Sequence, residues 1–188
     1  EILNSASAAF QSKEAGVVDF VGNEAEVFAQ IKKLTGLFPS NYKDQSKIKD
    51  CMDDLNRLCG NIQIADAVEI LTQIADENEF IELKKDYGTD MAIGFIRLDG
   101  ETVGCVANKE EKISSQGAKK AASFVKLCDA FGVGILTFTD VTGYAANLEQ
   151  EKELAQAVGA MTGAFVQASV PKVNVITKKA FGSAYVSM

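Results

Sequence analysis

The chain contains 188 residues, of which 47% are hydrophobic and 24% are charged, as expected for a globular chain of one domain or one domain and part of another. Its net charge of -7 and pI near 4.7 argue against a nucleic-acid-binding surface. It has no histidine and its four cysteines lack Cys-x-x-Cys spacing, which gives no support to zinc sites, Ser-His-Asp triads or Cys-His dyads. We therefore expect no metal centre, free thiols and a cytoplasmic protein.

The first predicted elements are a strand and a helix. Residues 15–21 form an apolar run that is typical of a strand. Asn23 followed by Glu26 is a capping-box pattern, so a helix is predicted to start there. Gly36 and Pro39 are expected to end it. The apolar face of this helix would carry Val27, Ile31 and Leu34.

A change of composition follows. Residues 42–60 are polar and charged, contain Cys51 and Cys59, and are predicted to be an inter-domain linker that could be helical in part. Residues 65–77 then have apolar side chains at helical spacing, which predicts another helix. Those side chains are Val68, Leu71 and Ala75.

The middle of the chain predicts a hairpin. Residues 91–98 and 102–107 are apolar runs on either side of Asp99-Gly100. Asp-Gly between two such runs favours a tight hairpin turn, because that turn needs positive φ angles.

Strands and helices then alternate. Residues 118–131 are predicted to be a helix with Gly132 as its stop, residues 135–139 a buried strand, and residues 148–168 a long helix. The inner face of the long helix would carry Leu154, Val158, Met161 and Phe165. Behind Pro171, the run of Val173, Val175 and Ile176 predicts a second buried strand. A strand, helix and strand of this length indicate a right-handed crossover between parallel strands.

Two turns would lie at the carboxyl ends of these parallel strands, where α/β folds bind ligands. One spans residues 139–146 and the other residues 181–185. In the second turn Gly182 permits a strained backbone, and a helix can begin behind it, so unpaired backbone N–H groups could bind a developing oxyanion. The same pattern also describes an ordinary βα unit, and Gly143 and Asp140 could equally be a tight-turn glycine and a backbone cap.

The amino-acid sequence of the second turn resembles a motif of a known family. Residues 178–185, Lys-Lys-Ala-Phe-Gly-Ser-Ala-Tyr, are similar to the Arg-Lys-Ala-Tyr-Gly-Gly-Ala-Tyr signature of the carboxyltransferase (beta-type) subunits of biotin-dependent acyl-CoA carboxylases and decarboxylases, of the propionyl-CoA and methylmalonyl-CoA type. The hairpin resembles the family's Val-Gly-Phe-Ala-Arg-Leu-Asn-Gly-x-x-Val-Gly-Ile-Val-Ala-Asn. The first turn resembles its Phe-Val-Asp-Val-Pro-Gly-Phe loop. Residues 15–20 and 38–41 resemble short sequence motifs near the end of the family's first domain.

The resemblance implies a fold and a domain division. The family is α/β and has two crotonase-like (ClpP/crotonase) domains, each a ββα spiral. Residues 1–41 would be the end of the first domain, residues 42–63 the linker, and residues 64–188 the first half of the second domain. Because Glu1 is not a start methionine and Met188 stops as a helix begins, we expect a segment of a longer protein that would be inactive alone.

The resemblance also implies a reaction, in which a carboxyl group moves between carrier-bound biotin and the α-carbon of a short acyl-CoA. In the family, biotin itself removes the α-proton after carboxybiotin has lost its carboxyl group, so the missing histidine is no objection. The catalytic donors would lie at Gly182, Ser183 and Ala184, where backbone N–H groups hold the carboxybiotin carbonyl or its enolate. The substrate-binding residues would be Gly143, Tyr144, Tyr185 and Val186, and Val186 would face the acyl chain.

The implied partners are acyl-CoA, a biotin carboxyl carrier protein, a biotin carboxylase or membrane decarboxylase subunit, and further copies in a dimer-based oligomer, expected to be a hexamer. Ser183 replaces the second signature glycine, Thr142 replaces the loop proline, and Tyr144-Ala145-Ala146 replaces Phe-Leu-Pro. Two alternatives stay open. One is another crotonase-superfamily CoA enzyme, such as a hydratase or isomerase, although the turns supply only Asp140 as an acid; the other is a non-catalytic binding segment.

Overall fold

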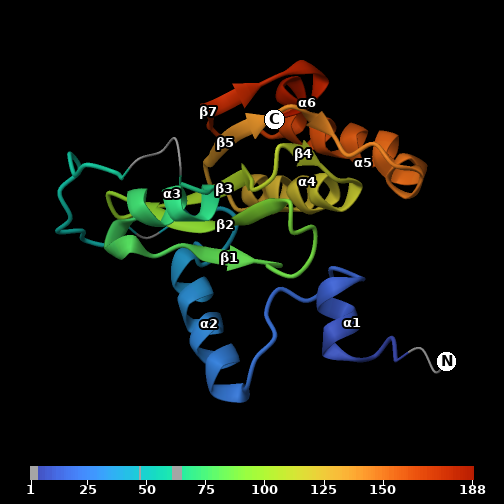
Figure 1. Ribbon diagram of the computed structural model, residues 1–188. Coiled ribbons are helices and arrows are strands. Elements are labelled where there is room, and N and C mark those ends of the chain that lie inside the picture. The colour runs from blue at the N-terminus through green and yellow to red at the C-terminus, as the bar shows by residue number, and fades with distance from the viewer. Residues whose placement is uncertain (1–3, 47, 61–64) are drawn as a thin grey trace.

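The computed structural model describes residues 4–46, 48–60 and 65–188. These residues form a five-stranded sheet in the order β1-β2-β3-β5-β7, with helices on both of its faces (Figure 1). β1, β2 and β3 are antiparallel neighbours, whereas β3, β5 and β7 run parallel. The strands are β1 (Ile81–Leu83), β2 (Met91–Leu98), β3 (Glu101–Asn108), β4 (Lys112–Ile113), β5 (Ile135–Val141), β6 (Gly143–Tyr144) and β7 (Lys172–Ala180). The helices are α1 (Ala8–Lys13), α2 (Glu24–Leu37), α3 (Ala67–Ile74), the 3-10 turn η1 (Asp76–Asn78), α4 (Ser115–Ala130), α5 (Leu148–Gln167) and α6 (Gly182–Ser187).

The predicted hairpin is confirmed as β2 and β3. Asp99 and Gly100 have φ angles of 52° and 79°, the conformation that a two-residue type I′ turn requires. Leu98 pairs with Glu101 directly across this turn. The hairpin therefore forms the antiparallel half of the sheet.

Two apolar layers cover the sheet. Alternate side chains of β3 point to opposite faces, so Val106 belongs to the larger core with α4 and α5, while Cys105 and Ala107 join a smaller core with α3. Phe95 of β2 lies fully buried in the larger core, where its ring contacts Phe124 of α4 at a centroid distance of 5.0 Å. The fold thus places helices on both faces of one sheet.

The predicted helices exist, with small changes at their ends. α2 has the full capping box, since the Asn23 side chain accepts from the Glu26 N–H and the Glu26 carboxylate accepts from the Asn23 N–H. Gly36 lies inside this helix, which ends before Pro39. α4 starts before Ala118 because Ser114 caps it, and Gly132, with a φ of 68°, follows its end as predicted.

The long helix α5 buries a different stripe from the predicted one. Met161 is fully buried, but Leu154, Val158 and Phe165 are only half-buried. The deepest neighbours of Met161 are Ala157 and Ala164. Small side chains fill this stripe because α5 packs closely against α4. The predicted crossover from β5 through α5 to the parallel strand β7 is confirmed.

The strand predicted at residues 15–21 is wrong. The segment is irregular, Gly16 has a φ of 63°, and no strand pairs with it among the described residues. Its main-chain contacts include a hydrogen bond from the Lys84 N–H to the Asp19 carbonyl, and Val17 and Val21 are more than half exposed. An apolar run becomes a strand only where another strand offers a ladder of hydrogen bonds.

The strand predicted behind Pro171 exists as β7, but its burial was predicted wrongly. Val173, Val175 and Ile176 are 58%, 37% and 49% exposed. β7 is the last strand in the order of the described sheet, and Figure 1 places it at the end opposite α2. Among the described residues only one of its edges is paired, so its β-branched side chains lack strand neighbours on the other side.

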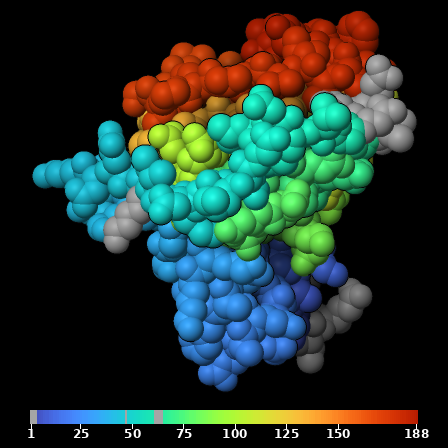
Figure 2. Space-filling model, turned by 90° about the vertical axis from the view of Figure 1, so that its left-hand side faces the viewer, coloured from blue at the N-terminus to red at the C-terminus, as the bar shows by residue number. Residues whose placement is uncertain are grey.

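The linker segment, defined here as residues 48–60, is attached to the sheet. It contains no helix, so the predicted helical content is not found in this described segment. The Lys49 N–H donates to the Gly100 carbonyl, and the Arg57 guanidinium donates to the carbonyls of Ile74 and Ala75. In Figure 2 residues of this part of the chain, together with α3, cover the molecule between α2 and β7. Residues 61–63 of the predicted linker lie outside the described residues.

Candidate functional site

The carboxyl ends of β5 and β7 meet in an irregular register. Thr139 pairs with Ile176 and Val141 pairs with Ala180. A step of two residues along β5 therefore corresponds to a step of four residues along β7. The extra residues bulge from the ladder and redirect the chain into α6. The Asp140 carboxylate lies beside the bulge and accepts a hydrogen bond from the Lys179 N–H at 3.0 Å.

Asn108, at the end of β3, joins the same arrangement from the other side. Its side-chain carbonyl accepts from the Asp140 N–H at 2.8 Å, and its amide donates to the Asp140 carbonyl. Asn108 is only 5% exposed. It therefore extends the β3–β5 ladder by one side chain and fixes the backbone of Asp140. Sequence reasoning missed this role, and only the position of an asparagine directly after a strand could have suggested it.

The predicted strand-to-helix turn is found at residues 180–184. Gly182 has a φ of 63° and begins α6, a conformation that glycine adopts readily. Apart from the adjacent residues and the backbone of α6 itself, no described atom lies within 4 Å of the position that a Cβ on Gly182 would occupy. No side chain of the described residues caps the helix, whose first N–H groups lack acceptors within the helix itself. Ala184 is fully buried in the larger core, and its packing there holds the turn in place.

The two predicted turns come together through Tyr144. β6, which contains Gly143 and Tyr144, pairs with β4 in a small parallel sheet. The Tyr144 hydroxyl lies 2.6 Å from the Ser187 Oγ of α6 and 3.4 Å from the Ser183 carbonyl oxygen. The sequence placed both turns at the carboxyl ends of parallel strands, but it gave no sign of Ser187 as the contact between them.

The other two predicted substrate-binding residues lie on α6. Tyr185 is 38% exposed and Val186 is 77% exposed. Val186 lines a cavity of about 230 Å³, which α5 and β7 also line with Phe165, Val166 and Val173. The wall of this cavity is mainly apolar, and Val186 forms part of it.

Charged side chains surround the strand ends. Lys179 forms an ion pair with Glu111, and this hydrogen bond raises the pKa of Lys179. Lys178 lies 3.8 Å from the other Asp140 oxygen. Because both Asp140 oxygens face β7 donors, this carboxylate is engaged in structure and is poorly placed to act as a free acid or base.

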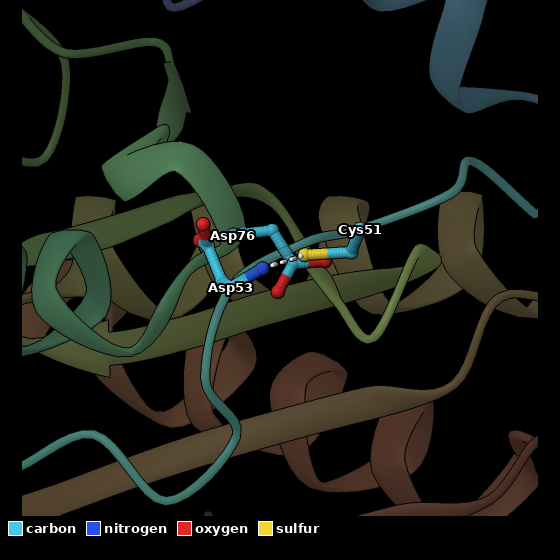
Figure 3. A group of neighbouring side chains, drawn as sticks. All are labelled: Cys51, Asp53 and Asp76. Atoms are coloured by element: carbon cyan, nitrogen blue, oxygen red, sulfur yellow. Dashed lines mark hydrogen bonds between the residues drawn. The ribbon is translucent and has the colours of Figure 1, made fainter.

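A second cluster of polar groups lies where the linker segment meets η1. Cys51, Asp53 and Asp76 place one potential ligand atom each within 4.8 Å of the others (Figure 3). Sequence reasoning missed this cluster because Asp76 is distant in the chain. Asp76 already accepts from the N–H groups of Asp99 and Gly100, and Asp53 accepts from the Glu77 N–H. The cluster therefore fastens the linker segment and η1 to the hairpin turn.

Comparison with known proteins decides the family. The family model described as "Carboxyl transferase domain" matches residues 5–188. The chain belongs to the carboxyl transferase domain family. It is 35% identical to the propionyl-CoA carboxylase beta chain of Cereibacter sphaeroides, over 95% of this chain and 38% of the relative. It is 33% identical to the methylmalonyl-CoA decarboxylase subunit alpha of Veillonella parvula, over 93% of this chain and 37% of the relative.

Solved structures agree with this carboxyl transferase assignment. Transcarboxylase 12S, in a structure with methylmalonyl-coenzyme A and methylmalonic acid bound, superposes with a TM-score of 0.90 at 26% identity, covering 97% of this chain and 38% of that one. The predicted α/β, crotonase-like fold of a carboxyltransferase is thus confirmed. The carboxyl transferase chain spans less than two fifths of the length of these relatives. In the described part of the chain, no helix is long and apolar enough to cross a membrane.

Proposed function

We propose that this chain is part of a carboxyltransferase that moves a carboxyl group between carrier-bound biotin and the α-carbon of a short acyl-CoA. The observation that carries the proposal is the turn at Gly182, with its positive φ, open space and uncapped helix start, in a chain of the carboxyl transferase domain family. Residues 1–41 would complete the first domain, residues 42–63 the linker, and residues 64–188 would begin the second.

The donors in this proposal are the N–H groups of the first turn of α6, at Gly182, Ser183 and Ala184. Bound carboxybiotin would supply the transferable carboxyl group. The chain would hold its carbonyl oxygen, and the negative charge that develops there, with N–H groups that are already oriented. The absence of a side chain on Gly182 leaves room for that oxygen, and the small side chains of Ser183 and Ala184 do not obstruct it.

The walls of the site would come from Gly143, Tyr144, Tyr185 and Val186. Space is open beside Gly143, since no described atom other than those of its chain neighbours lies within 4 Å of the position that a Cβ there would occupy. Tyr185 and Val186 are accessible on α6, and Val186 borders the mainly apolar cavity. An apolar wall suits a short apolar acyl chain.

A hydratase or isomerase is the weaker alternative. Such enzymes need a free acidic side chain over the thioester, and Asp140 is bound to Lys179 and approached by Lys178. A carboxyltransferase that relies on backbone donors has no such requirement.

The proposed partners are a biotin carboxyl carrier protein, a biotin carboxylase or membrane decarboxylase subunit, and further copies of the subunit. Transcarboxylase 12S forms a hexamer assembly and a multienzyme core, which supports a dimer-based hexamer here. We place the protein in the cytoplasm because Cys51, Cys59, Cys105 and Cys128 are free thiols.

The decisive experiment is decarboxylation of malonyl-CoA or methylmalonyl-CoA by the complete subunit, with and without free biotin. Biotin-dependent loss of the carboxyl group is the expected result. Turnover that is independent of biotin, or hydration of an enoyl-CoA by the same preparation, would contradict the proposal. The isolated segment of 188 residues is the control and should be inactive, because most of one domain would be missing.

A further inference from the structure

Three oxygen atoms form a compact hydrogen-bonded group behind the turn at Gly182. The Tyr144 hydroxyl lies 2.6 Å from the Ser187 Oγ, and that Oγ lies 2.8 Å from the Ser183 carbonyl oxygen. The Tyr144 hydroxyl is also 3.4 Å from the same carbonyl. The group connects β6 with both ends of α6.

The chemistry of the three groups sets the direction of their hydrogen bonds. A carbonyl oxygen can only accept, so Ser187 donates to Ser183 and uses a lone pair to accept from Tyr144. A tyrosine hydroxyl is protonated and able to donate near neutral pH, and burial raises the pKa of Tyr144 further above its ordinary value. Ser187 is itself only 7% exposed, so water has little access to compete for these bonds.

The Ser183 carbonyl and the Ala184 N–H belong to one peptide unit. Because a trans peptide is planar, a carbonyl held in one direction fixes the N–H on its opposite side. Hydrogen bonds to the carbonyl also polarise the peptide and strengthen its N–H as a donor. The buried Ala184 side chain holds the other side of the same unit in the core.

We propose that Tyr144 and Ser187 are positioning residues that orient and polarise the Ala184 N–H through the Ser183 carbonyl. The inference rests on the proposed function, in which this N–H is an oxyanion donor. In this inference Tyr144 does more than line the site, because its hydroxyl also holds α6 in place by hydrogen bonds.

Kinetics of the complete subunit test the inference. We expect Tyr144→Phe and Ser187→Ala each to lower kcat for biotin-dependent decarboxylation of methylmalonyl-CoA by about 3- to 10-fold, less than the loss of a whole oxyanion donor. KM for methylmalonyl-CoA should stay unchanged, because the donor acts in the transition state. The double variant should be at most slightly slower than Ser187→Ala alone, because Tyr144 acts mainly through Ser187 and its direct contact with the Ser183 carbonyl is long, at 3.4 Å.

Matched controls make the same chemical changes elsewhere. Tyr42→Phe removes a hydroxyl from a side chain that is 69% exposed. Ser123→Ala removes a serine that also bonds back to a carbonyl of its own helix, that of Lys120. Both controls should have wild-type kcat and KM.

Hydrogen–deuterium exchange without substrate gives a readout that is independent of turnover. The backbone amides of residues 183–188 should exchange faster in Tyr144→Phe and Ser187→Ala, with the remaining sheet unchanged. Unchanged kcat and exchange in Tyr144→Phe would overturn the inference, as would a rise in KM alone. Wild-type protein without biotin-dependent turnover would instead overturn the proposed function, and the exchange experiment would still decide whether Tyr144 braces α6.

Discussion

The Asp140 carboxylate accepts a hydrogen bond from the Lys179 N–H and thereby joins the end of β5 to the bulge of β7. Asn108 holds the Asp140 backbone from β3. One residue thus connects the ends of three parallel strands next to the turn that leads into α6. The same group would be the only acid in the two predicted turns, so its role separates two reaction classes.

Substitution of Asp140 distinguishes a structural carboxylate from a catalytic one. Asp140→Asn keeps an oxygen for the Lys179 N–H, so we expect most of the activity and stability to remain. Asp140→Ala removes that acceptor and should lower the free energy of unfolding by about 1 kcal/mol and reduce kcat. Denaturant unfolding and decarboxylation kinetics check both variants. Equal, near-complete loss of turnover in the two variants, with folding intact, would show that Asp140 is an acid or base.

Local signals predicted the elements, while long-range contacts determined the details. Asp99-Gly100 and the Asn23–Glu26 pair each act over a short stretch of chain, and both were read correctly from the sequence. The contact between Tyr144 and Ser187 joins residues 43 positions apart, and it depends on how β6 lies against α6. The exposure of Val175 likewise depends on which strands pair with β7, and no local pattern states this.

Because Gly100 lies close to Lys49, we expect the fold to require glycine at position 100. A Cβ on Gly100 would overlap the Lys49 carbonyl oxygen, and Gly100 also has a φ of 79°. We expect Gly100→Ala to cost about 1–2 kcal/mol for the backbone conformation and more for displacing the linker segment. Limited proteolysis should then cut within residues 48–60 faster.

Gly132→Ala is the matched control for the preceding variant. Gly132 has a similar φ of 68°, but no described atom other than those of its chain neighbours lies within 4 Å of the position that a Cβ there would occupy. Its substitution should therefore cost only the conformational part, measured by denaturant unfolding. Equal losses in the two variants would show that the linker segment does not press on Gly100.

Lys120 predicts an unusual dependence of stability on pH. Its side chain is 1% exposed, and its ammonium donates to the carbonyls of Tyr87 and Met91 at 2.9 and 2.7 Å. Burial lowers the pKa of Lys120 from 10.5 to about 8. Lys120→Met should lower the free energy of unfolding by about 2 kcal/mol at pH 7, because buried carbonyls lose their donor.

The sign of the pH effect follows from proton counting. Between about pH 8 and 10.5 the unfolded chain holds a proton on Lys120 that the folded chain lacks. The contribution of this group to stability therefore rises with pH in that window. The neutral amine still has two N–H donors for the two carbonyls. The difference in free energy of unfolding between wild type and Lys120→Met should widen there, whereas Lys126→Met, an exposed substitution on the same helix, should track the wild type. A constant difference would contradict a lowered pKa.

We expect the Val186 side chain to influence which acyl-CoA the enzyme prefers. It is 77% exposed on α6 and borders a mainly apolar cavity with Phe165 and Val166. Val186→Asp would place a charge on that wall, so the kcat/KM ratio of butyryl-CoA over acetyl-CoA in carboxyl transfer should fall by about tenfold, near the value of one methylene in an apolar pocket. Val21→Asp introduces the same charge at an exposed valine before α2 and should leave the ratio unchanged. If Val186→Asp keeps the wild-type ratio while the protein stays folded and active, the acyl chain does not reach this wall, and the preference must be set by other residues of the site.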